Sequence, residues 1–129
     1  MGPDIVVREG KTVIAIGDAK YKRVLEDPAA DEEVALTVEN VRFARSDLYQ
    51  LYTYMRLAKA KRGFFVAPAW RPNERAAWLV ECEFGERPPV KGAELRVLFL
   101  NLARPVREVL AEGAKELREF FAEVAPPPT

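Results

Sequence analysis

Two carboxylates and one amine close to the amino terminus have the types and the spacing needed for metal-assisted hydrolysis. Asp18 and Lys20 are two residues apart, so on a β-strand their side chains point to the same face. Asp4 precedes Asp18, with thirteen residues between them. Two carboxylates on one face repel each other, and a divalent cation such as Mg²⁺ or Mn²⁺ removes that cost. The predicted chemistry is phosphodiester hydrolysis, with Lys20 orienting a water molecule and stabilising developing negative charge.

A plainer interpretation of the same residues is a solvated strand face with an ion pair between Asp18 and Lys20. Surface pairs of that kind are common and contribute little to stability. Asp18, however, directly follows the apolar run of residues 13–17, so its charge stands at the end of a buried strand. We therefore favour the hydrolytic interpretation.

A β-hairpin is needed to bring Asp4 to the face of Asp18. Residues 4–8 and 12–22 have the composition of strands, and residues 9–11 carry a turn signal. A three-residue loop keeps the two acids on one face, whereas a loop of two or four residues breaks the arrangement. In one of the two registers that a three-residue loop allows, the acids are diagonal neighbours about 7–8 Å apart.

Further elements follow from hydrophobic periodicity and turn residues. A helix is predicted over residues 46–61, with Ser46 as its N-cap and Gly63 as its C-cap. Residues 34–41 can be a strand or part of a connection. Strands are predicted at residues 63–67 (stopped by Pro68), 77–84 and 95–102, and a last helix opens at Pro105, with an apolar stripe of Val106, Val109, Leu110, Ala114, Leu117, Phe120, Phe121 and Val124. This order predicts an α/β domain with a mixed sheet.

Composition excludes several kinds of site. The chain has no histidine and one cysteine, which excludes histidine-based catalysis, zinc sites built from histidine or several cysteines, and an intrachain disulfide. The formal net charge is zero, so contacts with phosphate must come from local patches. Cys82 is expected to be a packed strand residue.

One domain is expected over residues 1–124, with a disordered proline-rich tail at residues 125–129. The sequence shows no signal peptide and no apolar run of about 18 residues, so we expect a cytoplasmic protein without membrane contact. A composition rich in Ala, Arg, Glu and Pro and poor in Asn, Gln, Ser and Thr is typical of a thermophile.

Pro3-Asp4 followed by Asp18-Ala19-Lys20 resembles the signature of the PD-(D/E)xK nuclease superfamily. The resemblance extends over roughly residues 3–68, about half of the chain. It implies a restriction-endonuclease-like mixed sheet flanked by helices. The expected fold is short at its amino-terminal end, because family members carry a helix and a strand before the Pro-Asp motif.

Two longer segments, residues 16–22 and 47–54, are similar to the McrC-type nuclease subunit of modification-dependent restriction systems. Within the second segment, Gln50 and Tyr54 resemble the Gln-x-x-x-Tyr helix motif of RecB-like nucleases. The resemblance implies that these two side chains line the active site or touch substrate phosphate. It also implies a GTPase or another restriction-system subunit as a partner.

For the residues of the main signature, the resemblance implies ligand and catalytic roles. Asp4 and Asp18, with the backbone carbonyl of Ala19, are expected to ligate Mg²⁺ or Mn²⁺. Lys20 is expected to position the attacking water. The implied function is metal-dependent cleavage of DNA, as a restriction or DNA-processing endonuclease.

Basic residues gather in two segments that are expected to contact DNA phosphates. Residues 56–75 contain six basic side chains and one acidic side chain, and the hairpin region is also basic. Lys22, Lys61 and Arg62 are the predicted DNA-binding residues, although solvated strand and helix ends explain the same charges. A double-strand cut needs two active sites, which favours a homodimer.

Two other functions remain open. The domain can be a catalytically incomplete nuclease fold that binds nucleic acid or a partner. It can also be a non-enzymatic oligomeric protein whose apolar strands, residues 77–84 and 95–102, form an interface.

Overall fold

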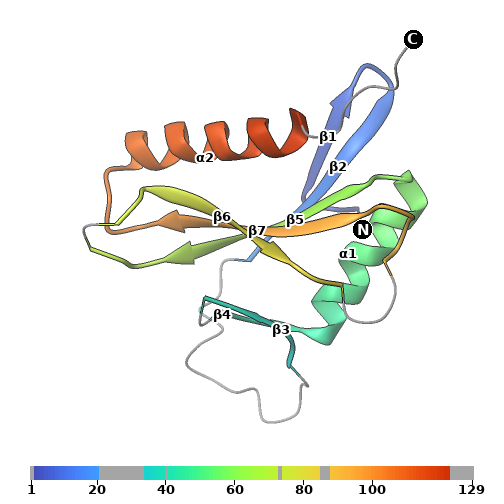
Figure 1. The fold of residues 1–129 in the computed structure, drawn as a ribbon, viewed down its shortest axis with the longest axis horizontal. Coiled ribbons are helices and arrows are strands. Elements are labelled where there is room, and N and C mark those ends of the chain that lie inside the picture. Colours follow the sequence, from blue (N-terminus) through green and yellow to red (C-terminus); the bar gives the residue numbers. More distant parts are fainter. Residues whose placement is uncertain (1, 21–33, 40, 73, 85–87, 123–129) are drawn as a thin grey trace.

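A mixed five-stranded sheet forms the centre of the computed structural model, which describes residues 2–20, 34–39, 41–72, 74–84 and 88–122 (Figure 1). Its strand order is β1-β2-β5-β7-β6. The strands are β1 (Ile5–Glu9), β2 (Thr12–Ala19), β5 (Arg62–Ala69), β6 (Ala77–Cys82) and β7 (Glu94–Asn101). The three central strands are parallel, and the edge strands β1 and β6 are antiparallel to their neighbours. The predicted α/β fold with a mixed sheet is confirmed.

Helices cover the two faces of this sheet (Figure 1). Helix α2 (Val106–Ala122) packs on one face, against β6 and β7. Helix α1 (Arg45–Ala58) packs on the other face, together with a hairpin of β3 (Val34–Val38) and β4 (Val41–Ala44). The segment that the sequence left undecided therefore contains a strand, which pairs with β4 in a second, two-stranded sheet.

The β1–β2 hairpin differs from the predicted one at its turn. Its loop has two residues, Gly10 and Lys11, so the predicted three-residue loop is wrong. Gly10 has a φ of +63°, a conformation that tight hairpin turns require and that glycine adopts without strain. A regular hairpin with this loop would place Asp4 and Asp18 on opposite faces.

A β-bulge in the same hairpin corrects this parity. Val7 pairs with Ala15, whereas Arg8 pairs with Val13, so Ile14 is an extra residue on β2. A bulge of this kind shifts the register by one residue and increases the local twist. The two acids therefore share a face, by a different route from the one predicted.

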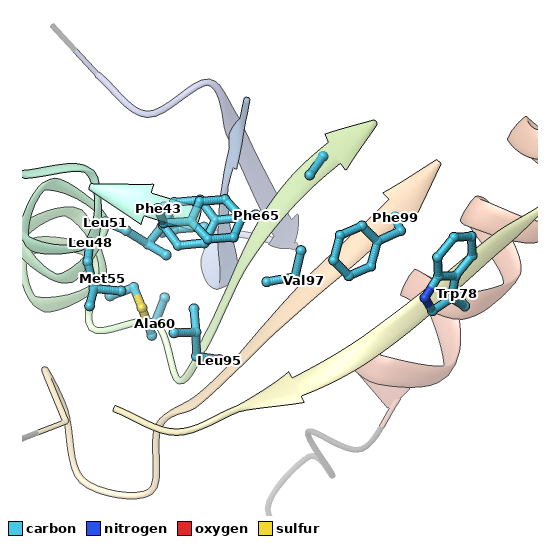
Figure 2. Close-up of a cluster of buried hydrophobic side chains, with 12 residues drawn as sticks. Phe43, Leu48, Leu51, Met55, Ala60, Phe65, Trp78, Leu95, Val97 and Phe99 are labelled. Carbon is cyan, nitrogen blue, oxygen red and sulfur yellow. The ribbon is translucent and has the colours of Figure 1, made fainter. Parts of the chain in front are cut away.

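The larger core lies on the α1 face and crosses most of the sheet. Figure 2 shows Phe43 of β4 against Phe65 of β5, stacked with ring centroids 4.5 Å apart, and Val97, Phe99 and Trp78 following across the sheet. The rings of Trp78 and Phe99 are also stacked, at 5.3 Å. This packing fixes the β3–β4 hairpin and the start of α1 over the parallel strands.

Both ends of α1 differ from the sequence prediction. The N-cap is Ala44, without a side-chain cap, so the predicted capping role of Ser46 is wrong. The helix ends at Lys59, which has left-handed backbone geometry (φ 56°), so Gly63 is not the C-cap. Gly63 lies inside β5, where a Cβ atom would stand 2.4 Å from Sδ of Met55, so close packing explains this glycine.

Pro68 does not stop β5 as predicted but lies inside it. The backbone carbonyl of Val66 accepts a hydrogen bond from Lys20 N on the β2 side (2.8 Å). Since backbone groups alternate in direction along a strand, the nitrogen of Pro68 faces that same side. Among the described residues, β2 pairs with β5 only as far as Val66, so Pro68 lies just past the end of this ladder.

The buried face of α2 is rotated relative to the predicted apolar stripe. Val106 and Leu110, both predicted to be on the stripe, are 72% and 62% exposed. The buried residues of α2 are Val109, Gly113 and Phe120. At Gly113 a Cβ atom would stand 3.3 Å from Cδ2 of Leu100, so the helix approaches β7 along its smallest residue.

Neither helix in the described residues is long and apolar enough to cross a membrane.

Cys82 is a partly buried residue of β6, as predicted, and burial raises the pKa of its thiol to about 11. The predicted tail at residues 125–129 lies outside the described residues.

Candidate active site

Asp4 and Asp18 face each other at the open end of the β1–β2 hairpin, opposite its turn. Ile5 pairs with Gly17, so the next position along the two chains brings Asp4 opposite Asp18. The side chain of Asp4 is exposed, and that of Asp18 is 19% exposed. Directly opposed antiparallel residues have Cβ atoms about 4.5–5.5 Å apart, which is closer than the diagonal arrangement predicted from the sequence.

A backbone hydrogen bond orients the carboxylate of Asp4. The N–H of Ala19 donates to Oδ2 of Asp4 at 3.1 Å. Strand β1 begins only at Ile5, so this N–H points past the end of the β1 ladder. The side chain of Asp4 replaces the missing backbone acceptor, and its carboxylate is thereby held beside β2.

The two carboxyl groups influence each other's protonation. Burial raises the pKa of Asp18; hydrogen bonding to Lys20 opposes this effect, and the hydrogen bond with Asp4 adds to it. Hydrogen bonding with Asp18, and then with the N–H of Ala19, lowers the pKa of Asp4. Opposite shifts are what two carboxyl groups in contact produce, because both cannot be ionised without repulsion. The pair is thus a place where added positive charge is favourable.

Lys20 lies between this pair and helix α1. Its Nζ is 2.6 Å from Oδ2 of Asp18 and 2.8 Å from Oδ1 of Asp47. Burial alone would lower the pKa of Lys20, but the hydrogen bonds to the two carboxylates outweigh it and the pKa is raised. The ammonium therefore stays charged beside the acids.

Asp47 belongs to the segment of residues 47–54, but no role at the site was predicted for it from the sequence. It lies in the first turn of α1, where its charge also suits the helix dipole. Its contact with Lys20 spans 27 residues, so no local pattern reveals it. The fold class offered one indication, because α/β proteins bind ligands at the edge of the sheet where the carboxyl ends of parallel strands lie.

Gln50 and Tyr54 lie on the same side of α1 as Asp47, at the i+3 and i+7 positions. Nε2 of Gln50 donates a hydrogen bond to Oη of Tyr54 at 3.2 Å. From Asp47, Gln50 is about 4.5 Å and Tyr54 about 10.5 Å away along the helix axis. Gln50 thus lies about one turn from Asp47, and Tyr54 lies further along the helix, partly packed against the core.

The two predicted DNA-binding residues that the structure describes do not lie at the acid pair. Lys61 is exposed at the start of β5, and Lys22 lies outside the described residues. Arg62 is 8% exposed; its guanidinium is 2.8 Å from the carboxylate of Glu94 and lies over the ring of Phe120, on the face covered by α2. Arg62 is thus a buried structural residue, on the opposite face of the sheet from Asp18.

The side chains at this site fit a hard divalent cation. Mg²⁺ is commonly bound through one or two carboxylates and several waters. The opposed carboxylates of Asp4 and Asp18 are such a pair, and the backbone carbonyl of Ala19 is the third oxygen that the sequence suggested. The described residues contain no group of three His, Cys, Asp or Glu side chains placed to hold a metal ion.

Comparison with known proteins concerns the half of the chain that carries this site. The family described as McrBC 5-methylcytosine restriction system component matches residues 1–68 of the 129. No curated protein matches the chain. The matched residues include both acids, Lys20 and Asp47. The chain therefore belongs to the family of McrBC 5-methylcytosine restriction system components.

Proposed function

We propose that the chain is a metal-dependent DNA endonuclease, of restriction or DNA-processing type, built on a PD-(D/E)xK nuclease core. The observation that supports this best is the meeting of Asp4, Asp18 and Lys20 at one end of the β1–β2 hairpin. Membership of a restriction-system family makes DNA the expected substrate. The proposed nuclease domain spans residues 1–124.

In this proposal each residue of the site has a separate task. Asp4 and Asp18, with the carbonyl of Ala19, would hold Mg²⁺ or Mn²⁺, and a bound ion would supply Lewis-acid activation of water and of the phosphate. Lys20 orients the attacking water and stabilises charge that develops on the phosphate. Gln50 and Tyr54, which are hydrogen-bonded to each other, line the site or contact substrate phosphate.

DNA, a second copy of the chain and another restriction-system subunit are the proposed partners. Two copies would supply the two active sites that a double-strand cut requires. Exposed Lys61 and the basic residues around the hairpin are the proposed phosphate contacts. Buried Arg62 is left out of this set because its guanidinium is paired with Glu94.

The test is cleavage of plasmid DNA, with and without methylated cytosine, in the presence of Mg²⁺ or Mn²⁺. Lys20→Ala should lower the rate by about 10²–10³-fold, the usual cost of losing one group that stabilises transition-state charge. The matched control is Lys91→Ala, since Lys91 is exposed in the turn between β6 and β7. Equal cleavage by the wild type and the Lys20 variant would reject the proposal.

A second candidate is a catalytically incomplete nuclease fold that binds nucleic acid or a partner. The observation in its favour is that no third acidic ligand accompanies the two carboxylates in the described part of the chain. This candidate predicts DNA binding that weakens with salt, without cleavage under any metal condition.

A further inference from the structure

We propose that Asp47 is a positioning residue, which holds the ammonium of Lys20 at the reaction site independently of Asp18. This inference rests on the proposed function, since it assigns Lys20 a role in phosphodiester hydrolysis. It goes beyond that function by making the start of α1 part of the catalytic apparatus.

The geometry that carries the inference is a lysine held between two elements. Asp18 belongs to β2 and Asp47 to α1, and their oxygens are 2.6 Å and 2.8 Å from Nζ of Lys20. The Lys20 and Asp47 side chains are 19% and 32% exposed, so the pair is partly shielded but reachable by solvent. An ammonium has three N–H donors. Two directed toward these carboxylates leave a third for a water or a phosphoryl oxygen.

Asp18 alone is a poor anchor for this lysine. Its carboxylate also contacts Asp4, and in the proposed function it is a metal ligand as well. Asp47 comes from a different element and is not one of the proposed ligands. An ammonium held by Asp47 keeps its position when the oxygens of Asp18 are directed toward a cation.

Helix α1 gives Asp47 a fixed position. The next residue, Leu48, is 5% exposed, and Leu51 is 1% exposed, so the first turns of the helix are packed into the core. Backbone N–H of Lys20 donates to the carbonyl of Val66 at 2.8 Å, which fixes the other partner to β5. The Lys20–Asp47 contact therefore joins two rigid points of the fold rather than two mobile side chains.

The first test is Asp47→Asn in the full chain, which keeps the size of the side chain and removes its charge. Loss of a supporting residue of this kind typically costs about 10–100-fold in activity. We expect that loss in kcat for plasmid cleavage, with KM unchanged. Asp47→Glu keeps the charge and should recover part of the rate.

A second measurement reports on Lys20 without needing activity. Selective ¹⁵N labelling of the seven lysines makes their ammonium groups visible by NMR, and Lys20→Arg identifies the signal of Lys20. In the wild type this signal should be protected from exchange with water. In Asp47→Asn the protection should be lost.

A matched control separates positioning from helix stability. Ser46 is exposed and adjacent to Asp47 in the first turn, so Ser46→Asp combined with Asp47→Asn restores the charge at the helix end but not the contact with Lys20. If the double variant recovers the Lys20 signal and the rate, Asp47 acts through the helix and the inference is wrong.

The inference is also wrong if Asp47→Asn leaves the Lys20 signal unchanged. Failure of the proposed function looks different. A wild type that never cleaves DNA would reject the nuclease, while the lysine signal would still decide whether Asp47 holds Lys20.

Discussion

The two faces of the sheet each place a basic side chain against carboxylate, but in different surroundings. On the α1 face, Lys20 lies between Asp18 and Asp47 at the carboxyl end of β2, with its side chain 19% exposed. On the α2 face, Arg62 pairs with Glu94 at the amino end of β5, with its side chain 9% exposed. The first arrangement lies at the edge where α/β sheets bind ligands, and the second lies beneath a helix.

Arg62 also differs from Lys20 in having an aromatic ring as a neighbour. Phe120 of α2 is fully buried, with the guanidinium of Arg62 5.6 Å and that of Arg96 4.4 Å from its ring centroid. These contacts hold both guanidinium groups against a buried ring. Both regions thus join opposite charges, but only the Lys20 pairs lie at the end of a parallel strand and partly open to solvent.

The largest effect on stability is expected from Phe120→Ala, which should lower the free energy of unfolding by about 3–5 kcal/mol. The reason is that the ring is fully buried and packs against Phe121 as well as the two arginines. Urea unfolding measures this loss. Leu110→Ala is the control on the same helix, because Leu110 is 62% exposed and its loss should change stability by no more than about 0.5 kcal/mol.

We expect packing on the α2 face and cleavage on the α1 face to be independent of each other. Phe120→Ala should leave DNA cleavage per folded molecule unchanged at low temperature, whereas Lys20→Ala should lower the cleavage rate by about 10²–10³-fold with a much smaller effect on unfolding. A Phe120 variant that folds but does not cleave would show that the α2 face also shapes the site.

Gly17→Ala is the substitution expected to affect both faces. A Cβ atom at Gly17 would stand 2.4–2.9 Å from three carbons of the Phe64 ring, which is fully buried. Overpacking of this kind costs about 1–3 kcal/mol, and the backbone shift would reach the adjacent Asp18. Unfolding and cleavage should both suffer. Gly2→Ala is the control, since nothing lies within 4 Å of its added atom, and an unaffected Gly17 variant would contradict the close contact.

How much the sequence revealed differs between local and distant features. The strands β2, β6 and β7, the last helix and the shared face of Asp18 and Lys20 were predictable, because each depends on local periodicity and spacing. The bulge at Ile14 was not, since it depends on how β2 pairs with β1. Asp4 and Asp18 thus share a face as predicted, although the predicted loop and the predicted diagonal register were wrong.

Tertiary packing explains what the sequence did not reveal. Arg62 is a charged residue in a basic segment, which is typical of the protein surface. Only the packing of α2 shows that it is buried. Asp47 has the position of an ordinary residue in a first helical turn, and only the fold brings it to Lys20. Long-range contacts of this kind carry no local signature.

The smallest effect concerns Glu112, whose Oε2 accepts a hydrogen bond from the N–H of Ala77 at 3.0 Å and so joins α2 to the start of β6. This hydrogen bond is the main reason why the pKa of Glu112 is lowered from 4.5. A lowered folded-state pKa stabilises the fold above the unfolded value, and this contribution is lost as the pH falls through the folded value. Glu112→Gln should therefore be less stable than wild type at pH 7, with the difference in urea midpoint disappearing in acid. A difference that persists unchanged at pH 2 would rule out this origin.

Pro68 bears on how copies of the chain can associate. Among the described residues, β5 continues past the end of β2, and strands that lack a neighbour on one side are templates for pairing with other molecules. The ring nitrogen of Pro68 faces this open side, so a foreign strand aligned there would lack a hydrogen bond in the middle of the new ladder. Among the described residues, assembly of two copies through shared backbone pairing is thus discouraged at this end of β5.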